Sequence, residues 1–341
     1  MVKDNKKESE DISIDDILNA VEKDILKTYG AETLIRGADI PDGTFIKTGS
    51  LRLDLNLGGG IKTGHPIMIY GNFSTGKTTI ALHLASQAQK INRKVYYIDL
   101  EHALDKSLMQ TIPELDLKNI TVIRPHDAEE ALNDIDKLLR VGQPLYIVVD
   151  SVSALVPKKE LEGDMEDQEM GTQAKLLSKA MRKLTPFISK SQSTVVFINQ
   201  IREKMVMFGN PETVSGGRAL AYFSGAIIKC SVGGKADYIL DEEGNRIGHY
   251  ITMRSEKCKW TVPFRDARVP LIFGKGYDHI QELIELSQEF GQIEQKGPYY
   301  NIGDKKYQGK EKLRQAILED KDLYKTLIDK INTYINASQK I

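Results

Sequence analysis

The 341-residue chain is longer than one ordinary domain requires, and its length favours two or three structural units. With 40% hydrophobic and 28% charged residues it has the composition of a soluble globular protein, and it contains no apolar run long enough to span a membrane. The net charge of −1 excludes a protein that binds polyanions through bulk charge, so any nucleic-acid site must be a local patch.

The N-terminal segment and the cysteines predict a cytoplasmic protein. The first residues are polar and mixed in charge, without the apolar segment of a secretory signal. The chain has two cysteines, Cys230 and Cys258, which are too few for a disulfide scaffold and lack the spacing of metal ligands. A reducing compartment fits this usage.

The first predicted element is a short amphipathic helix. Ser13 can cap a helix that runs through Tyr29 and ends at Gly30. Its apolar face would carry Ile17, Val21 and Ile25. A helix this short cannot bury its apolar face alone, so we expect it to pack on another surface, such as a neighbouring subunit.

Between about residues 44 and 274, short apolar strands alternate with helical segments. Strands are predicted at 67–70, 94–99, 120–123, 145–149 and 194–199. Near-continuous apolar runs of this kind are typical of a parallel sheet covered by helices on both faces. Residues 225–232 and 248–260 instead predict a hairpin at the sheet edge, joined by the DEEGN turn.

Beyond Gly276 the sequence predicts a smaller unit. It contains two or three helices and a strand pair around Tyr299–Tyr307, with a Gly-Asp turn.

A glycine-rich motif directly follows the strand 67–70 and precedes a helical run. It consists of Gly71, Asn72, Phe73, Ser74, Thr75, Gly76, Lys77 and Thr78, the pattern G-x-x-x-x-G-K-T, and Thr79 follows it. Such a loop turns backbone N–H groups inward, and the helix N-terminus adds partial positive charge. Lys77 would then reach the β- and γ-phosphates of a nucleotide, and Thr78 would ligate Mg²⁺. The alternative is a glycine-rich turn that happens to contain a lysine.

Three polar residues stand at the carboxyl ends of other predicted strands. Asp150 ends the run LYIVV, where it would hold Mg²⁺ through water or serve as a structural cap. Glu101 is the candidate base for the attacking water, the alternative being a cluster that caps a helix. Gln200 could sense the γ-phosphate or satisfy backbone groups. Open α/β sheets bind ligands at this edge, so we expect a nucleoside triphosphate to be hydrolysed here.

Two segments and the helix between them predict a nucleic-acid contact. Residues 162–170 are acidic and contain two methionines, and residues 201–217 combine basic with large apolar side chains. The basic and large apolar residues of the second segment are Arg202, Lys204, Met205, Met207 and Phe208. Such residues can hold a sugar–phosphate backbone and wedge between bases, although they also suit a surface loop with an apolar anchor. In the predicted helix 172–190, Lys175, Lys179 and Arg182 share one face, which contacts either phosphate or solvent.

From about residue 35 to residue 310 the sequence closely resembles bacterial RecA recombinases. The matching segments include TGSLRLDLNLGGG, GKTT, IDLEHALD, IVVDSVSALVPKKELEG, MGTQAKLLSKAMRKL, FINQIR, MFGNPETVSGG and FGKG. The resemblance implies an α/β fold, a RecA-type P-loop ATPase core with a mostly parallel central sheet. It implies an N-terminal tail and oligomerisation helix at 1–40, the core at 41–274, and a small α+β C-terminal domain at 275–341.

The resemblance also implies roles for single residues. Glu101 would be the catalytic glutamate, Gln200 the switch glutamine at the γ-phosphate, and Lys77 a further catalytic residue. Asp105 would contact adenine, and Lys257 and Lys259 would reach ATP on the neighbouring subunit. The DNA-contacting positions would be Met170, Lys175, Arg182, Arg202, Lys204, Met207, Phe208, Gly216 and Gly217, with the two DNA-binding loops at 163–170 and 201–214.

The implied function is ATP- and Mg²⁺-dependent strand exchange between single-stranded DNA and a homologous duplex, carried out by a helical filament of the protein. A self-cleaving repressor and loading or single-strand-binding proteins are further partners of the family, and no membrane is involved. Leu108 departs from the family tyrosine that stacks on adenine, and the acidic tail of cellular members is missing, which predicts easier loading onto duplex DNA. The competing interpretations are a ring-forming translocase and a DNA-coating protein without turnover.

Overall fold

The chain divides by its internal contacts into two units, residues 1–43 and 44–341. The computed structural model describes residues 13–30, 33–40, 43–163, 171–203 and 212–338. In the first unit, α1 (Ile14–Tyr29) is followed by a 3-10 turn at Gly37–Asp39. The hydroxyl of Ser13 accepts a hydrogen bond from the N–H of Asp16, and Gly30 ends the helix with φ 93°. The predicted N-terminal helix is therefore confirmed.

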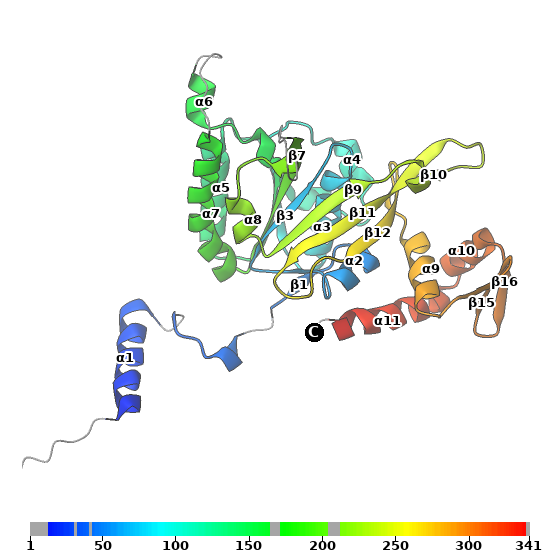
Figure 1. Ribbon diagram of the computed structural model, residues 1–341, viewed down its shortest axis with the longest axis horizontal. Helices are drawn as coiled ribbons and strands as arrows, with labels where there is room; N and C mark the ends of the chain where they lie inside the picture. Colours follow the sequence, from blue (N-terminus) through cyan, green and yellow to red (C-terminus); the bar gives the residue numbers. More distant parts are fainter. Residues whose placement is uncertain (1–12, 31–32, 41–42, 164–170, 204–211, 339–341) are drawn as a thin grey trace, which may run out of the picture. The chain divides into compact units, whose positions relative to one another are not determined.

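The second unit is built on an eleven-stranded sheet (Figure 1). Its parallel part has the order β9-β3-β7-β6-β4-β5. The bounds are β3 (Pro66–Gly71), β4 (Lys94–Asp99), β5 (Ile120–Ile123), β6 (Leu145–Asp150), β7 (Thr194–Glu203) and β9 (Ala226–Val232). All five strands expected from apolar runs are present, and the predicted α/β fold with a mostly parallel sheet is confirmed.

Antiparallel strands extend this sheet beyond β9. They are β11 (Arg246–Cys258), β12 (Asp266–Ile272) and β13 (Gly276–Tyr277), while β10 (Tyr238–Leu240) pairs with β11 and β8 (Glu212–Val214) with β7. The predicted pairing of 225–232 with 248–260 is confirmed by the β9–β11 ladder. Its placement at the edge is wrong, because β9 also pairs with β3 and because β12 and β13 continue the sheet outside β11. The DEEGN turn joins β10 to β11 instead.

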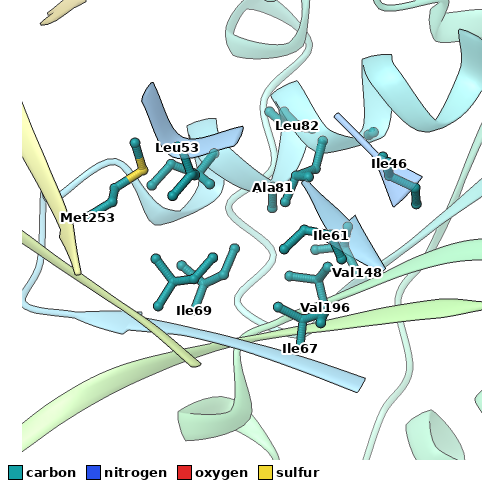
Figure 2. Close-up of a cluster of buried hydrophobic side chains, with 14 of the residues drawn as sticks. Ile46, Leu53, Ile61, Ile67, Ile69, Ala81, Leu82, Val148, Val196 and Met253 are labelled. Carbon is teal, nitrogen blue, oxygen red and sulfur yellow. The ribbon is translucent and has the colours of Figure 1, made fainter. Parts of the chain in front are cut away.

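Helices cover both faces of the sheet, as Figure 1 shows. On one face lie α2 (Leu51–Asn56) and α3 (Lys77–Lys90), and on the other lie α5 (Ala128–Arg140), α7 (Thr172–Lys190) and α8 (Ala219–Phe223). Figure 2 shows the first of these interfaces, with Leu53 of α2 and Ala81 of α3 stacked over Ile67 and Ile69 of β3. These apolar contacts pack α2 and α3 against the sheet, and the strand ladders align the carboxyl ends of β3, β7, β6 and β4.

Shorter elements connect these layers. They are β1 (Phe45–Ile46) paired with β2 (Ile61–Lys62), α4 (Lys106–Gln110), α6 (Lys158–Glu162) and 3-10 turns at Leu117–Asn119, Val152–Ala154 and Lys235–Asp237.

The C-terminal segment forms its own apolar cluster. Its elements are α9 (His279–Glu289), β14 (Glu294–Lys296), β15 (Tyr299–Ile302), β16 (Lys305–Gln308), α10 (Lys310–Glu319) and α11 (Lys321–Ser338). The predicted strand pair is present as β15 and β16. Leu51 and Leu55 of α2 pack against this cluster, so α2 contacts both cores. Among the described helices, none combines the length and apolar character that crossing a membrane requires.

Candidate nucleotide-binding site

The loop between β3 and α3 adopts a backbone that requires glycine at two positions. At Gly71 a Cβ would lie 2.2 Å from the carbonyl oxygen of Cys230. Gly76 has φ +79°, and a Cβ there would lie 2.5 Å from Cδ1 of Ile251. α3 begins directly after Gly76, at Lys77. The first N–H groups of a helix have no partner within it, so this end of α3 is suited to bind an anion.

Lys77 folds back over this loop. Its Nζ donates a hydrogen bond to the carbonyl oxygen of Asn72 at 2.6 Å. Burial lowers the pKa of Lys77, and the nearby carboxylates of Asp150 and Glu101 act in the opposite direction. A phosphate group would replace the neutral carbonyl by a charged acceptor, which is the stronger partner for an ammonium group.

Asp150 ends β6 and is joined to Ser151 by a cis peptide bond. Its Oδ2 accepts hydrogen bonds from Oγ1 of Thr78 at 2.9 Å and from the hydroxyl of Tyr97 at 2.5 Å. Burial raises the pKa of Asp150, and these two hydrogen bonds lower it. Mg²⁺ prefers oxygen ligands and commonly uses one or two protein groups together with phosphates and water. The pair Thr78 and Asp150 fits that requirement.

Glu101 and Gln200 meet at the same end of the sheet. Nε2 of Gln200 donates a hydrogen bond to Oε1 of Glu101 at 2.8 Å. The hydroxyl of Ser151 donates to the same oxygen, and it also shares a 2.5 Å hydrogen bond with the hydroxyl of Ser153. The carboxylate of Glu101 is thus held by side chains from β7 and from the segment that follows β6.

These groups line one cavity of about 280 Å³. Its lining consists of Phe73, Ser74, Thr75, Gly76, Lys77, Thr78, Glu101, Asp150, Ile198 and Gln200. The structure therefore brings together residues that come from four separate parts of the sequence. Gly71 and Asn72 precede the lining residues of the loop, and Thr79 lies in the first turn of α3.

Comparison with known proteins agrees with this geometry. A family model of the RecA N-terminal domain matches residues 16–278. The chain is 39% identical to Protein RecA of Mesoplasma florum over 322 residues, which cover 93% of this chain and 95% of that protein. It is 39% identical to Protein RecA of Thermus aquaticus over 324 residues, covering 94% and 93% respectively. The chain belongs to the RecA family. It is accordingly a nucleotide-binding, DNA-dependent ATPase of the recombinase class.

Four positions that the RecA resemblance places near the nucleotide lie apart from this cavity. Asp105 caps α4, and hydrogen bonds from Ser107 lower the pKa of its exposed carboxyl group. Leu108 packs against the core. Nζ of Lys257 donates to two backbone carbonyls of α8 at 2.8 Å, and Lys259 is exposed. Contacts from these residues would require either a ligand larger than the cavity or a second copy of the chain.

Of the described residues expected to contact DNA, Lys175 and Arg182 stand on α7, and Gly216 and Gly217 lie beside it. Lys175 and Arg182 are exposed on this helix, whereas Leu177 and Leu184 are buried, as the helical pattern predicts. A Cβ at Gly216, whose φ is +79°, would lie 2.4 Å from Cδ1 of Leu177, so the glycine lets the chain pass close to α7.

Two more of the expected positions are described, Gly217 and Arg202. A Cβ at Gly217 would lie 3.1 Å from Ala174 of α7. Arg202 is exposed on β7, opposite Thr213 of β8. The predicted positions Met170, Lys204, Met207 and Phe208 lie outside the described residues.

Sequence reasoning missed two groups that surround the cavity. Tyr97 and Ser151 hydrogen-bond the two carboxylates, and a sequence signal exists only for Ser151, which directly follows Asp150. It also missed a basic hollow of about 620 Å³ beside the P-loop, whose lining includes Lys229, Arg246 and Arg254. Lys229 and Arg254 stand opposite each other in the β9–β11 ladder, a register that the predicted hairpin does not give, because its DEEGN turn joins β10 to β11.

Proposed function

We propose that this protein binds ATP with Mg²⁺, forms helical filaments on single-stranded DNA and exchanges strands with a homologous duplex, with hydrolysis of ATP stimulated by DNA. The observation that supports it most is the single cavity shared by the P-loop, Asp150, Glu101 and Gln200. Gln200 stands on β7, the strand that leads directly into Arg202 and the second expected DNA-binding loop.

In the proposed reaction, the polar residues of the cavity have separate roles. Lys77 and the N-terminus of α3 would neutralise the β- and γ-phosphates, and Thr78 and Asp150 would hold Mg²⁺. When bound, Mg²⁺ neutralises charge that develops on the phosphate oxygens. Glu101 accepts a proton from the attacking water, and the hydroxyl of Ser151 orients its carboxylate. The protein forms no covalent bond with DNA.

The hydrogen bond between Glu101 and Gln200 offers a route for coupling to DNA. While the amide of Gln200 donates to Glu101, it occupies an oxygen that a water molecule would otherwise meet. Binding of DNA near Arg202 would act on the same strand and favour the conformation in which Gln200 turns to the γ-phosphate. Glu101 is then released to act as the base.

Self-assembly is proposed from the exposed apolar face of α1. This face carries Ile14, Ile17, Leu18 and Val21, all of them exposed. We propose that it docks on the next copy of the chain, and that Lys257 and Lys259 of one copy reach the ATP of its neighbour. Asp105 would contact the adenine ring. A nucleotide held between two copies would make filament growth depend on ATP.

Strand exchange also requires a surface for the second DNA molecule. The basic hollow beside the P-loop is the candidate for the homologous duplex, because Lys229, Arg246 and Arg254 line it. Phosphate contacts of this kind are independent of base sequence and weaken with salt.

The RecA resemblance supports further proposals about location and partners. We propose a cytoplasmic location, with a self-cleaving repressor and loading or single-strand-binding proteins as further partners.

The deciding experiment is steady-state hydrolysis of ATP by the purified protein in Mg²⁺, with and without homopolymeric single-stranded DNA. Large stimulation by DNA is the expected result. Fast hydrolysis that ignores DNA would contradict the proposed coupling and favour a translocase or a DNA-independent ATPase. ATP-dependent binding of DNA without hydrolysis would favour the coating protein.

A further inference from the structure

Tyr97 is a buried polar residue that no step of the proposed reaction uses. It lies in β4 between Tyr96 and Ile98, and its side chain is only 1% exposed. Because side chains alternate along a strand, Tyr97 enters the apolar cluster under α2 and α3, while Tyr96 packs on the opposite face. A tyrosine hydroxyl buried in apolar surroundings needs a hydrogen-bond partner.

The partner of this hydroxyl is the carboxylate of Asp150. β4 pairs in parallel with β6, and the ladder brings Asp99 opposite Asp150 at the carboxyl ends of both strands. Tyr97 stands two residues earlier, on the same face, and its hydroxyl donates to Oδ2 of Asp150 at 2.5 Å. Thr78 donates to this same oxygen at 2.9 Å.

The two hydrogen bonds fix how the carboxylate is turned. Tyr97 approaches from within the sheet and Thr78 from the first turn of α3. Both donors meet Oδ2, and neither of them engages Oδ1. Without the Tyr97 hydroxyl, the carboxylate of Asp150 would keep a single hydrogen bond from the part of the chain that the structure describes, the one from Thr78.

The charge of Asp150 also needs this support. Asp150 is only 8% exposed, and the carboxylates of Glu101 and Asp99 are close enough to oppose its negative charge. A hydrogen bond to a buried anion compensates part of the lost hydration. Tyr97 therefore supports both the orientation and the charge of the group.

We infer that Tyr97 is a positioning residue for Mg²⁺: its hydroxyl holds Asp150 in the orientation that binds the metal with the nucleotide. This inference rests on the proposed Mg²⁺–ATP site. Partners of metal ligands of this kind typically contribute about 10- to 100-fold to metal affinity. Because the Thr78 hydroxyl also holds Asp150, we expect a loss near the lower end, about tenfold.

The test is the variant Tyr97→Phe, which removes one oxygen and preserves the ring that fills the core. Its matched control is Tyr146→Phe. Tyr146 is equally buried in the same cluster on the neighbouring strand, but its hydroxyl donates to the carbonyl oxygen of Ala81 at 2.9 Å. Since both substitutions conserve volume, both variants are expected to fold, which circular dichroism and thermal melting without nucleotide would verify.

Binding of a fluorescent ATP analogue is measured first in EDTA and then as Mg²⁺ is added. In EDTA, we expect the two variants and the parent protein to bind the analogue equally. The Mg²⁺ concentration for the half-maximal response should rise about tenfold in Tyr97→Phe and less than about twofold in Tyr146→Phe. An unchanged Mg²⁺ response in Tyr97→Phe would overturn the inference. Weaker binding in EDTA would also overturn it, because a general structural defect would then explain the loss.

A second comparison tests whether the effect passes through Asp150. In the background Asp150→Asn, adding Tyr97→Phe should change the Mg²⁺ response no further, since the group that Tyr97 positions is already altered. A further tenfold loss in that background would overturn the inference. If the parent protein itself bound the analogue without any Mg²⁺ effect, the proposed metal site would fail, and the inference with it.

Discussion

Replacement of Asp54 by asparagine should reduce the loss of stability that the folded chain undergoes as the pH rises from 5 to 8. Asp54 lies in α2 and is only 4% exposed. Its Oδ1 accepts a hydrogen bond from the N–H of Thr48 at 2.8 Å, and Nζ of Lys47 is 4.0 Å from Oδ2. Burial raises the pKa of Asp54 from its usual 3.8 to about 7, and these contacts only partly oppose the shift.

The magnitude follows from proton linkage. Between pH 3.8 and about 7 the folded chain binds more protons at Asp54 than the unfolded chain, so stability falls as pH rises through this window. At about 1.4 kcal/mol per pH unit, the full loss is about 4 kcal/mol. Roughly 1.5 kcal/mol of this loss lies below pH 5, which leaves about 2.5 kcal/mol between pH 5 and pH 8.

In the variant Asp54→Asn, the side-chain amide would keep an oxygen for the N–H of Thr48 and would not titrate. The free energy of unfolding of Asp54→Asn, relative to the parent, should therefore increase by about 2.5 kcal/mol between pH 5 and pH 8. The free energy of unfolding can be measured by urea titration with the fluorescence of Trp260, the single tryptophan, as the signal. Trp260 reports on this region because its Nε1 donates a hydrogen bond to the carbonyl oxygen of Leu57, immediately after α2. The exposed Asp304→Asn is the control. A difference between Asp54→Asn and the parent that is the same at both pH values would contradict the argument.

Three further substitutions test the nucleotide and DNA sites. Lys77→Ala should abolish nucleotide-dependent filament formation on DNA, and ATP-driven strand exchange by this variant would contradict the P-loop assignment. Arg202→Ala should weaken DNA affinity about tenfold, the equivalent of one hydrogen bond between charged groups, and reduce DNA-stimulated hydrolysis more than basal hydrolysis. Equal loss of both activities would indicate a structural role. Gly76→Ala should weaken ATP binding about 5- to 30-fold, because the left-handed backbone costs about 1–2 kcal/mol and the added Cβ meets Cδ1 of Ile251, so normal affinity would count against the described loop.

The parallel sheet was predictable from sequence because each of its central strands is an uninterrupted apolar run. The run LYIVV can be recognised as a strand without knowing its neighbouring strands, since a strand buried on both faces contains few polar residues. The order of strands was not predictable in this way. β9 is a member of both the parallel and the antiparallel parts of the sheet, and only the pairing with β3 shows that it is internal.

In the candidate site too, features that lie within one segment were predictable, and contacts between distant segments were not. The P-loop is contiguous, so its glycines and Lys77 were identified with their neighbours, and Asp150 was found because it ends a strand. The contact between Tyr97 and Asp150 joins residues that are far apart in sequence and depends on the lateral register of β4 and β6. A buried tyrosine in a strand gives no sign in the sequence of what its hydroxyl meets.

The arrangement of β7 indicates why nucleotide and DNA should favour each other's binding. Gln200 and Arg202 are two residues apart on one strand, so they share a face, and a shift of the strand moves both. Gln200 has two alternative partners, Glu101 in the described structure and a γ-phosphate in the proposed complex. If either ligand shifts β7 to the arrangement in which Gln200 meets the γ-phosphate, the other ligand no longer has to supply the free energy of that shift. Coupling between two binding sites is reciprocal. We therefore expect ATP to raise DNA affinity by the same factor by which DNA raises ATP affinity. Two titrations in Gln200→Ala should show both factors fall together.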